Sequence, residues 1–127
     1  MKTTTIISIL IAVLLIGGAI FLSGNNKNLD NINNVSIVDG KQIIEINAKG
    51  GYFPRTTIAQ ANIPTVIKIE TNGTFDCSSA LVIPSIGYRT NLSPKGVTEI
   101  ELSPQKLGTK LQGLCAMGMY NFSIEFN

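Results

Sequence analysis

The stretch VSIVDGKQIIEINA, residues 35–48, places the dipeptide Asp39-Gly40 between two runs that are rich in β-branched residues. Asp-Gly flanked by such runs is a strong signal for a β-hairpin, because both central residues of a type I′ turn take positive φ. The stretch therefore predicts two antiparallel strands at the start of a β domain.

The rest of the chain continues the two-residue period. Alternating segments are TVIKIET (65–71), GVTEIELSP (96–104) and YNFSIEF (120–126), and a shorter apolar run, SSALVIPS (78–85), is stopped by a proline. This period is typical of strands with one face in a core. No window carries a long helical stripe, and about seven short strands at this spacing predict an all-β, Greek-key sandwich of two sheets.

The N-terminal part has a different composition. An apolar run, Ile6–Leu22, follows Lys2, and its length is at the short end of what spans a bilayer. The flanking AIFLSG is a poor cleavage site, so an uncleaved, single-pass anchor is favoured over a cleaved signal peptide. We expect a transmembrane helix in residues 1–22, a polar tether in 23–34 and a folded domain in 35–127. The domain would face the extracytoplasmic (periplasmic) side of the cell membrane, or be secreted if the segment is cleaved.

The composition also excludes several classes of function. The chain has no histidine, and ten Lys and Arg are interspersed with eight Asp and Glu for a net charge of +2. Without imidazole there is no common general base near neutral pH, no Ser-His or Cys-His pair and no histidine metal site. Without a cluster of basic residues, no nucleic-acid surface is expected. We therefore expect a binding protein, not an enzyme, with no catalytic residues.

The segment GLCAMGMYNF, residues 113–122, concentrates the sulfur of the chain. Cys115, Met117 and Met119 stand on alternate positions, and Gly118 favours a tight loop in which their side chains can converge. Thiolate and thioether donors are soft ligands that select Cu(I), whereas the absence of imidazole disfavours Cu(II). The segment therefore predicts a site for copper in its reduced state.

The second cysteine, Cys77, lies in NGTFDCSSALVIP, at the start of a predicted strand that can neighbour the C-terminal one. Here the sequence resembles the cupredoxin fold. The likeness runs from Tyr52 to Asn127 and is carried by GGYFP, ANIPTVIKIETN, TFDCSSALVIPS and NLSPKGVTEIELSPQKLGTKLQGLCAMGMY. More narrowly, the chain is similar to exported cupredoxin-like domains attached to, or encoded beside, bacterial copper and heavy-metal transport proteins.

The resemblance implies a ligand set for the metal. Blue copper proteins of this fold use two histidines, a cysteine and a weak axial methionine. By position, the first histidine falls on Cys77, and the cysteine falls on Cys115. The axial methionine falls on Met119, while the second histidine has no counterpart and Met117 is the nearest replacement. This set departs from that of the blue copper proteins, and because two thiolates with thioethers hold Cu(I) and resist its oxidation, the departure favours Cu(I) binding over electron transfer.

Two functions follow as alternatives. The first is a membrane-tethered domain that stores Cu(I) or passes it to a membrane metal transporter or a metalloenzyme assembly factor. The second is an interaction module without metal, a β-sandwich stapled by a Cys77–Cys115 disulfide, which is the default for an exported domain with two cysteines. Both stay open, because two ligands of one metal also lie near disulfide distance. Asp76, beside Cys77, is either a turn former or a residue that tunes the thiol.

Overall fold

The computed structural model describes residues 2–23 and 33–127, which belong to two separate units of the chain. The first unit contains one helix, α1 (Lys2–Ser23). Among the described residues, no helix combines the length and the apolar character needed to cross a membrane. Most of the tether predicted over residues 23–34 lies outside the described residues.

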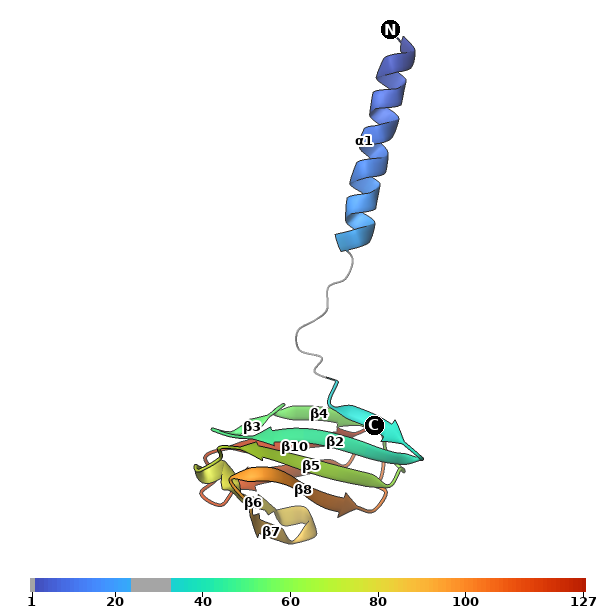
Figure 1. The fold of residues 1–127 in the computed structure, drawn as a ribbon. Helices are drawn as coiled ribbons and strands as arrows, with labels where there is room; N and C mark the ends of the chain where they lie inside the picture. The colour runs from blue at the N-terminus through green and yellow to red at the C-terminus, as the bar shows by residue number, and fades with distance from the viewer. Residues whose placement is uncertain (1, 24–32) are drawn as a thin grey trace. The chain divides into compact units, whose positions relative to one another are not determined.

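The second unit is built from β-strands (Figure 1). Residues 33–127 form β1 (Val35–Val38), β2 (Lys41–Ala48), β3 (Tyr52–Phe53), β4 (Thr56–Ala59), β5 (Thr65–Asn72), β6 (Ala80–Ile83), β7 (Tyr88–Asn91), β8 (Lys95–Leu102), β9 (Lys110–Cys115) and β10 (Asn121–Phe126). The only helical turns in this range are the short 3₁₀ segments η1 (Cys77–Ser79) and η2 (Pro84–Ile86), as the lack of a helical stripe predicted.

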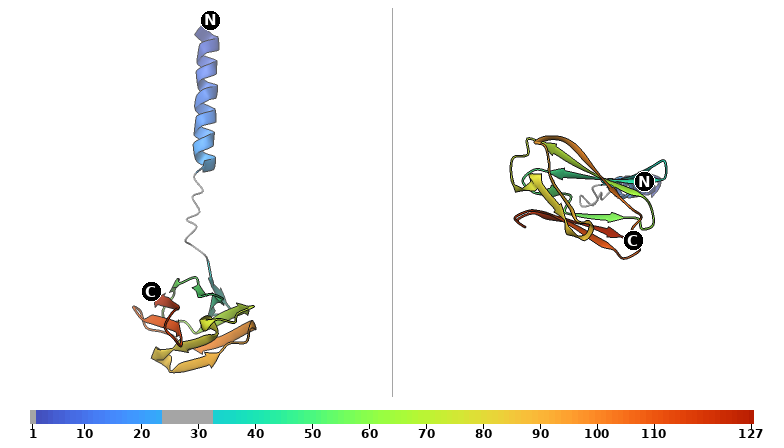
Figure 2. Two further views of the ribbon diagram at one scale, coloured as in Figure 1. Left: turned by 90° about the vertical axis from the view of Figure 1, so that its left-hand side faces the viewer. Right: turned by 90° about the horizontal axis from the view of Figure 1, so that it is seen from below.

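The strands form two mixed sheets that make two layers (Figure 2). One sheet has the order β1-β2-β5-β8, with β3 paired to β2, and the other has the order β4-β10-β9-β6-β7. The pairs β2–β5 and β4–β10 are parallel, and the other pairs are antiparallel. The predicted two-sheet, mostly β architecture is therefore present, with ten strands instead of about seven because several edge strands are very short.

The hairpin predicted around Asp39-Gly40 is confirmed. Asp39 has φ 51° and Gly40 has φ 75°, and the flanking residues Val38 and Lys41 pair across the turn. Positive φ at both central residues gives the turn a twist that matches the strands on either side. Local backbone preference thus determines where the chain first reverses direction.

One hydrophobic core lies between the two sheets. It draws alternate residues from strands of both layers, as the two-residue period predicts. Its completely buried apolar side chains include Ile44, Ile46, Ile67, Ile69, Leu81, Ile83, Phe122, Ile124 and Phe126. Both layers are thereby held together by the same apolar contacts.

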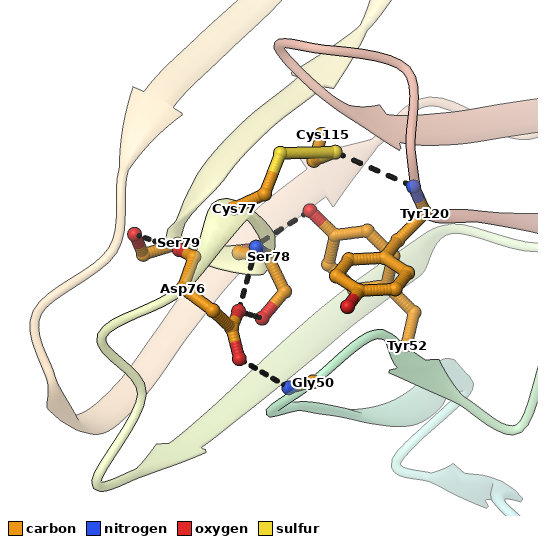
Figure 3. The surroundings of a disulfide bond; sticks show 8 residues. All are labelled: Gly50, Tyr52, Asp76, Cys77, Ser78, Ser79, Cys115 and Tyr120. Carbon is orange, nitrogen blue, oxygen red and sulfur yellow. Dashed lines mark hydrogen bonds between the residues drawn. A yellow bond between two sulfur atoms is a disulfide. The ribbon is translucent and has the colours of Figure 1, made fainter.

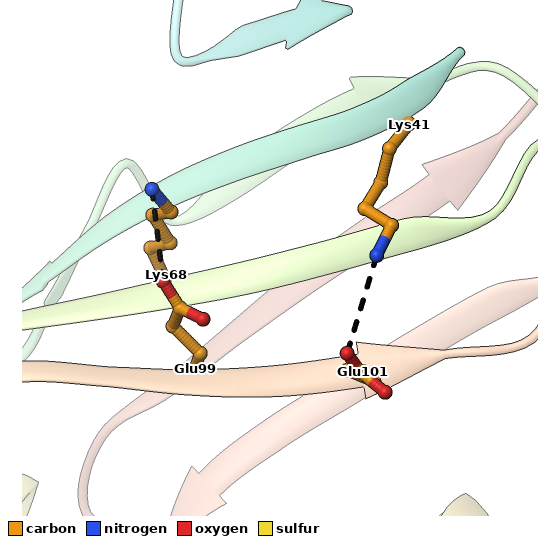
Figure 4. A network of polar contacts seen from close by, with 4 residues as sticks. All are labelled: Lys41, Lys68, Glu99 and Glu101. Carbon is orange, nitrogen blue, oxygen red and sulfur yellow. Dashed lines mark ion pairs between the residues drawn. The ribbon is translucent and has the colours of Figure 1, made fainter. Parts of the chain in front are cut away.

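The outward face of the first sheet carries ion pairs (Figure 4). Lys68 Nζ lies 3.7 Å from Glu99 Oε1, and Lys41 Nζ lies 4.0 Å from Glu101 Oε1. The Glu99 and Glu101 side chains are more than half exposed, as the alternation predicted. Exposed pairs of this kind contribute little stability, so the core and not these pairs holds the layers together.

Close packing of β9 on β10 depends on a glycine. Gly113 pairs with Phe122, and a Cβ added at Gly113 would lie 2.2 Å from carbons of the Phe122 ring. The ring is fully buried and also makes an edge contact with Tyr52, with centroids 5.1 Å apart. The absence of a side chain at Gly113 therefore leaves the space that the Phe122 ring occupies.

We expect Gly113→Ala to destabilise the domain by about 1–3 kcal/mol, because the added methyl overlaps a ring that has no free space to enter. Alanine elsewhere in a strand is usually favoured over glycine, so the sign of the effect tests the contact. Urea unfolding measures it. The overlap is disproved if Gly113→Ala is as stable as the parent.

Candidate metal centre

The two cysteines, which are far apart in the sequence, are brought together by pairing of β6 with β9. Leu81 on β6 pairs with Cys115, the last residue of β9, and Cys77 begins η1 just before β6. The Cα atoms of Cys77 and Cys115 are 5.7 Å apart, and a disulfide joins the side chains. The two cysteines are therefore close, as both alternatives require, but the strand after Cys77 pairs with β9 and not with the C-terminal strand β10.

Burial differs between the two sulfur-bearing residues. Cys115 is completely buried at the edge of the core, whereas Cys77 is only partly buried. Oxidised to a disulfide, the pair offers no thiolate to a metal. A metal ligated by both residues requires the reduced dithiol, whose sulfur atoms this backbone spacing keeps within reach of one ion.

Both methionines lie in the turn between β9 and β10. The N–H of Gly118 donates to the carbonyl of Cys115 over 2.8 Å, and Gly118 has φ 71°, so the segment is the tight loop that the glycine predicted. Met117 is 81% exposed and Met119 is 64% exposed. Neither is a core side chain, and both thioethers are therefore available to a ligand at the surface.

Hydrogen bonds hold Cys115 and the residues beside it, and Figure 3 shows the one that its sulfur atom accepts. The N–H of Tyr120 donates to Cys115 Sγ over 3.4 Å, and the N–H of Cys115 donates to the Tyr120 carbonyl over 3.0 Å. The N–H of Ala116 donates to the Ala80 carbonyl over 2.8 Å, which ties the turn to β6. The buried cysteine is thus held firmly, while the adjacent turn presents the methionines.

Asp76 organises the loop that carries Cys77. Its carboxylate caps η1 by accepting from the N–H of Ser78 over 2.8 Å and from the Ser78 hydroxyl, and it also accepts from the N–H of Gly50. The Ser78 hydroxyl is the largest cause that lowers the pKa of Asp76, and the N–H groups of Ser78 and Gly50 and the charge of Lys49 add to it. Asp76 is therefore a turn former, and it also ties the Cys77 loop to the bend after β2.

Tyr52 is hydrogen-bonded to the same loop. Its hydroxyl donates to the Ser78 carbonyl over 2.9 Å, and burial, followed by the nearby negative charge of Asp76, raises the pKa of Tyr52 to about 12. The partner of its hydroxyl is a backbone carbonyl 26 residues away, and no local pattern announces such a contact.

The lowered pKa of Asp76 gives a pH dependence with a definite sign. The hydrogen-bonded carboxylate stabilises the fold above its ordinary pKa of 3.8, and this contribution is lost as the pH falls through the lower folded value. We expect Asp76→Asn to lower the urea midpoint of unfolding at about pH 7. The midpoint of this variant should also fall less than that of the parent as the pH is lowered to about 3. Asp39→Asn is the matched control, since asparagine also accepts positive φ in the hairpin turn. A parent and an Asp76→Asn protein with parallel pH profiles would contradict this role.

The donors at this end of the domain fit a soft cation and not a hard one. Within residues 2–23 and 33–127, no three side chains of His, Cys, Asp or Glu gather in a way that could hold a metal. The potential donors are the two cysteine sulfurs, once their disulfide is reduced, and the two thioethers of the adjoining turn. Sulfur donors select Cu(I) over Mg²⁺ or Ca²⁺, which take oxygen ligands.

Comparison with solved structures shows two copper-binding domains of similar fold. One is the crystal structure of the metal-binding domain of the Cu(I)-exporting P-type ATPase CopA of Streptococcus pneumoniae D39 with Cu(I), at 26% identity and a TM-score of 0.66, covering 73% of this chain and 92% of that one. The other is the NMR structure of a copper binding protein in the apo form, at 22% identity and a TM-score of 0.66, covering 73% and 94%. No protein-family model and no curated protein matches the sequence. The β unit thus shares its fold with two copper-binding domains.

Proposed function

We propose that this chain binds Cu(I) through the reduced thiols of Cys77 and Cys115 together with the thioethers of Met119 and Met117. The observation that carries the proposal is the surface exposure of both methionines on a turn that begins at the buried cysteine. These are the only two methionines beyond the initiator, and both are exposed, so packing in the core does not account for where they lie. The shared fold with the CopA metal-binding domain, solved with Cu(I), supports the same function.

The two kinds of donor have different tasks in this proposal. The thiols ionise when they bind the metal and release their protons, so affinity falls at low pH. The thioethers carry no proton and lie on the exposed turn, where each can leave the metal and be replaced by a donor from another molecule. A buried cysteine that retains the ion, beside exposed methionines that exchange, suits storage or handover of Cu(I) and not catalysis.

The proposal extends to the setting of the domain. We infer a cupredoxin-like, Greek-key form of the two-sheet fold, held outside the cytoplasm by the N-terminal segment. The receiver of the copper would be a membrane metal transporter or a metalloenzyme assembly factor. In an oxidising compartment the disulfide and the metal compete for the same two sulfur atoms, so supply of a thiol reductant would control loading.

The second candidate is the interaction module stapled by the disulfide. The observation on its side is the Cys77–Cys115 bond itself, which closes a separation of 38 residues. It leaves the two exposed methionines without a role, since a solvent-exposed thioether contributes little to a core. We therefore rank it below copper binding.

The test is a Cu(I) titration of the full chain against a competing chelator, without oxygen. After reduction we expect tight binding. The oxidised protein should bind at least about a hundredfold more weakly, because it has lost both thiolates. Thiol counting and copper analysis on protein isolated without reductant then tell which form is present. A reduced chain that does not compete for Cu(I) would leave the stapled module as the function.

A further inference from the structure

A hollow of about 660 Å³ lies beside the proposed copper site. The side chains that give it its character are Lys49, Phe53, Arg55, Met119 and Tyr120. Met119 is also a proposed copper ligand, so the hollow and the metal centre share a wall. Whatever occupies the hollow would therefore touch the donor from which copper is exchanged.

The hollow exists because two turns from different sheets meet there. The bend after β2 closes with a hydrogen bond from the Lys49 N–H to the Gly51 carbonyl over 2.9 Å. A Cβ added at Gly51 would lie 3.5 Å from the Tyr120 ring, so the ring packs directly on the glycine. This contact brings the bend against the turn that carries Met119.

The hollow is positively charged. Lys49 and Arg55 are both exposed and line it, and no acidic residue is among the described residues that do so. The ion pairs between described residues, which join Lys41, Lys68 and Lys110 to glutamates, leave both side chains out. Asp76 lies next to the hollow, but its oxygens accept hydrogen bonds from Gly50 and Ser78. The charge of Asp76 partly offsets that of Lys49, which, after the hydrogen bond from Ser78, helps to lower the pKa of Asp76. Arg55 has no ion-pair partner among the described residues, and both cations stay exposed to a negative partner.

The hollow also offers apolar surface. Phe53 is 57% exposed and Met119 is 64% exposed. Apolar contact area flanked by cations, in a concave surface, fits a polypeptide segment with acidic side chains next to apolar or sulfur-bearing ones. A bilayer surface is flat and would reach the rim of such a hollow but not its wall.

We propose that this hollow docks an acidic segment of the protein that exchanges Cu(I) with this chain. That the partner exchanges Cu(I) rests on the proposed function, and the charge of the hollow adds that the docking segment is acidic. Attraction by Lys49 and Arg55 raises the rate of encounter and orients the partner. Docking would then hold the ligands of the partner beside Met119, so that one thioether can be replaced without release of the ion to water.

The probe is a synthetic peptide with methionines flanked by glutamates, and its twin has glutamines in place of the glutamates. Binding of the labelled, metal-free peptide to the full chain is followed by fluorescence anisotropy at about 20 mM and about 300 mM salt. We expect the glutamate peptide to bind more tightly than its twin and to weaken as salt rises. In the Lys49→Glu/Arg55→Glu variant, binding should fall by about tenfold or more.

The matched control is Arg89→Glu/Lys106→Glu, which makes the same change of charge at two exposed residues outside the hollow. It should bind the glutamate peptide as the parent does. The proposal is overturned if the Lys49→Glu/Arg55→Glu variant binds normally, or if both variants lose binding equally, because overall charge alone would then explain the attraction. It is also overturned if vesicles containing phosphatidylglycerol bind in a Lys49- and Arg55-dependent manner while the peptide does not.

A second measurement separates this proposal from the copper proposal. Equilibrium Cu(I) affinity of each variant is measured against the competing chelator, and we expect all of them to match the parent. Peptide docking with no Cu(I) affinity in the parent would mean that the copper proposal fails and the docking surface stands. Normal Cu(I) affinity with unchanged docking in Lys49→Glu/Arg55→Glu would mean the reverse.

Discussion

Cys115→Ser should lose at least about a hundredfold in Cu(I) affinity under reducing conditions, since loss of an outer partner of a metal ligand already costs about 10–100-fold. The serine hydroxyl is hard, stays protonated near neutral pH and cannot replace the thiolate. Cys115 lies at the end of β9, where it is completely buried and its backbone is hydrogen-bonded. Of the proposed ligands it is therefore the one that a neighbouring residue can least easily replace. Competition with a Cu(I) chelator measures the loss.

Ala116→Ser is the matched control, because it places a hydroxyl on the exposed neighbouring residue and leaves every sulfur in place. It should bind Cu(I) as the parent does. Cys77→Ser should behave like Cys115→Ser, and the circular dichroism of each variant shows whether the fold is kept. A folded Cys115→Ser protein that binds Cu(I) as tightly as the parent would end the copper proposal.

Phe122→Ala should destabilise the domain by about 3–5 kcal/mol, which is the usual cost of removing a buried aromatic ring. The side chain is completely buried, covers Gly113 on the neighbouring strand and meets the edge of Tyr52. Because small domains have only about 5–15 kcal/mol of stability, this single change removes a large part of it. Urea unfolding at constant pH and redox state measures the loss.

Phe53→Ala is the control for the loss of a phenyl ring. Phe53 is 57% exposed, so its truncation should change stability by no more than about 0.5 kcal/mol. The contact with Gly113 is isolated by a double-mutant cycle, in which Gly113→Ala should cost less in the Phe122→Ala background than in the parent. Additive effects of Gly113→Ala and Phe122→Ala would show that the two residues do not act on each other.

The Cys77–Cys115 disulfide affects how both experiments are arranged. Closing a loop of 38 residues stabilises a fold by restricting the unfolded chain, by about 3–4 kcal/mol. Stability comparisons therefore need the same redox state in every protein, and metal comparisons need the reduced one. Under that condition the two predictions test different parts of the domain: the core and the turn at its end.

Local sequence was sufficient for much of the fold. The Asp39-Gly40 turn follows from backbone preference, and the inward faces of β8 and β10 follow from alternation, because a side chain in a strand is placed by its parity. The tight turn containing Gly118 follows from the same kind of local signal. The parallel pairs β2–β5 and β4–β10 were not predicted, since the partner of a strand is chosen by packing of the whole core.

The candidate site divides in the same way. The sequence by itself determined which donors a metal site could use, because donor type is a property of the residues: beyond the initiator methionine it holds four sulfur atoms and no histidine, and three of these sulfur atoms fall within residues 115–119. Only the tertiary structure decided that Cys77 reaches Cys115, that Asp76 binds the Gly50 bend and that Lys49 and Arg55 line a hollow beside Met119. These contacts join segments far apart in the chain, and they exist because burying one shared core sets which strands lie side by side.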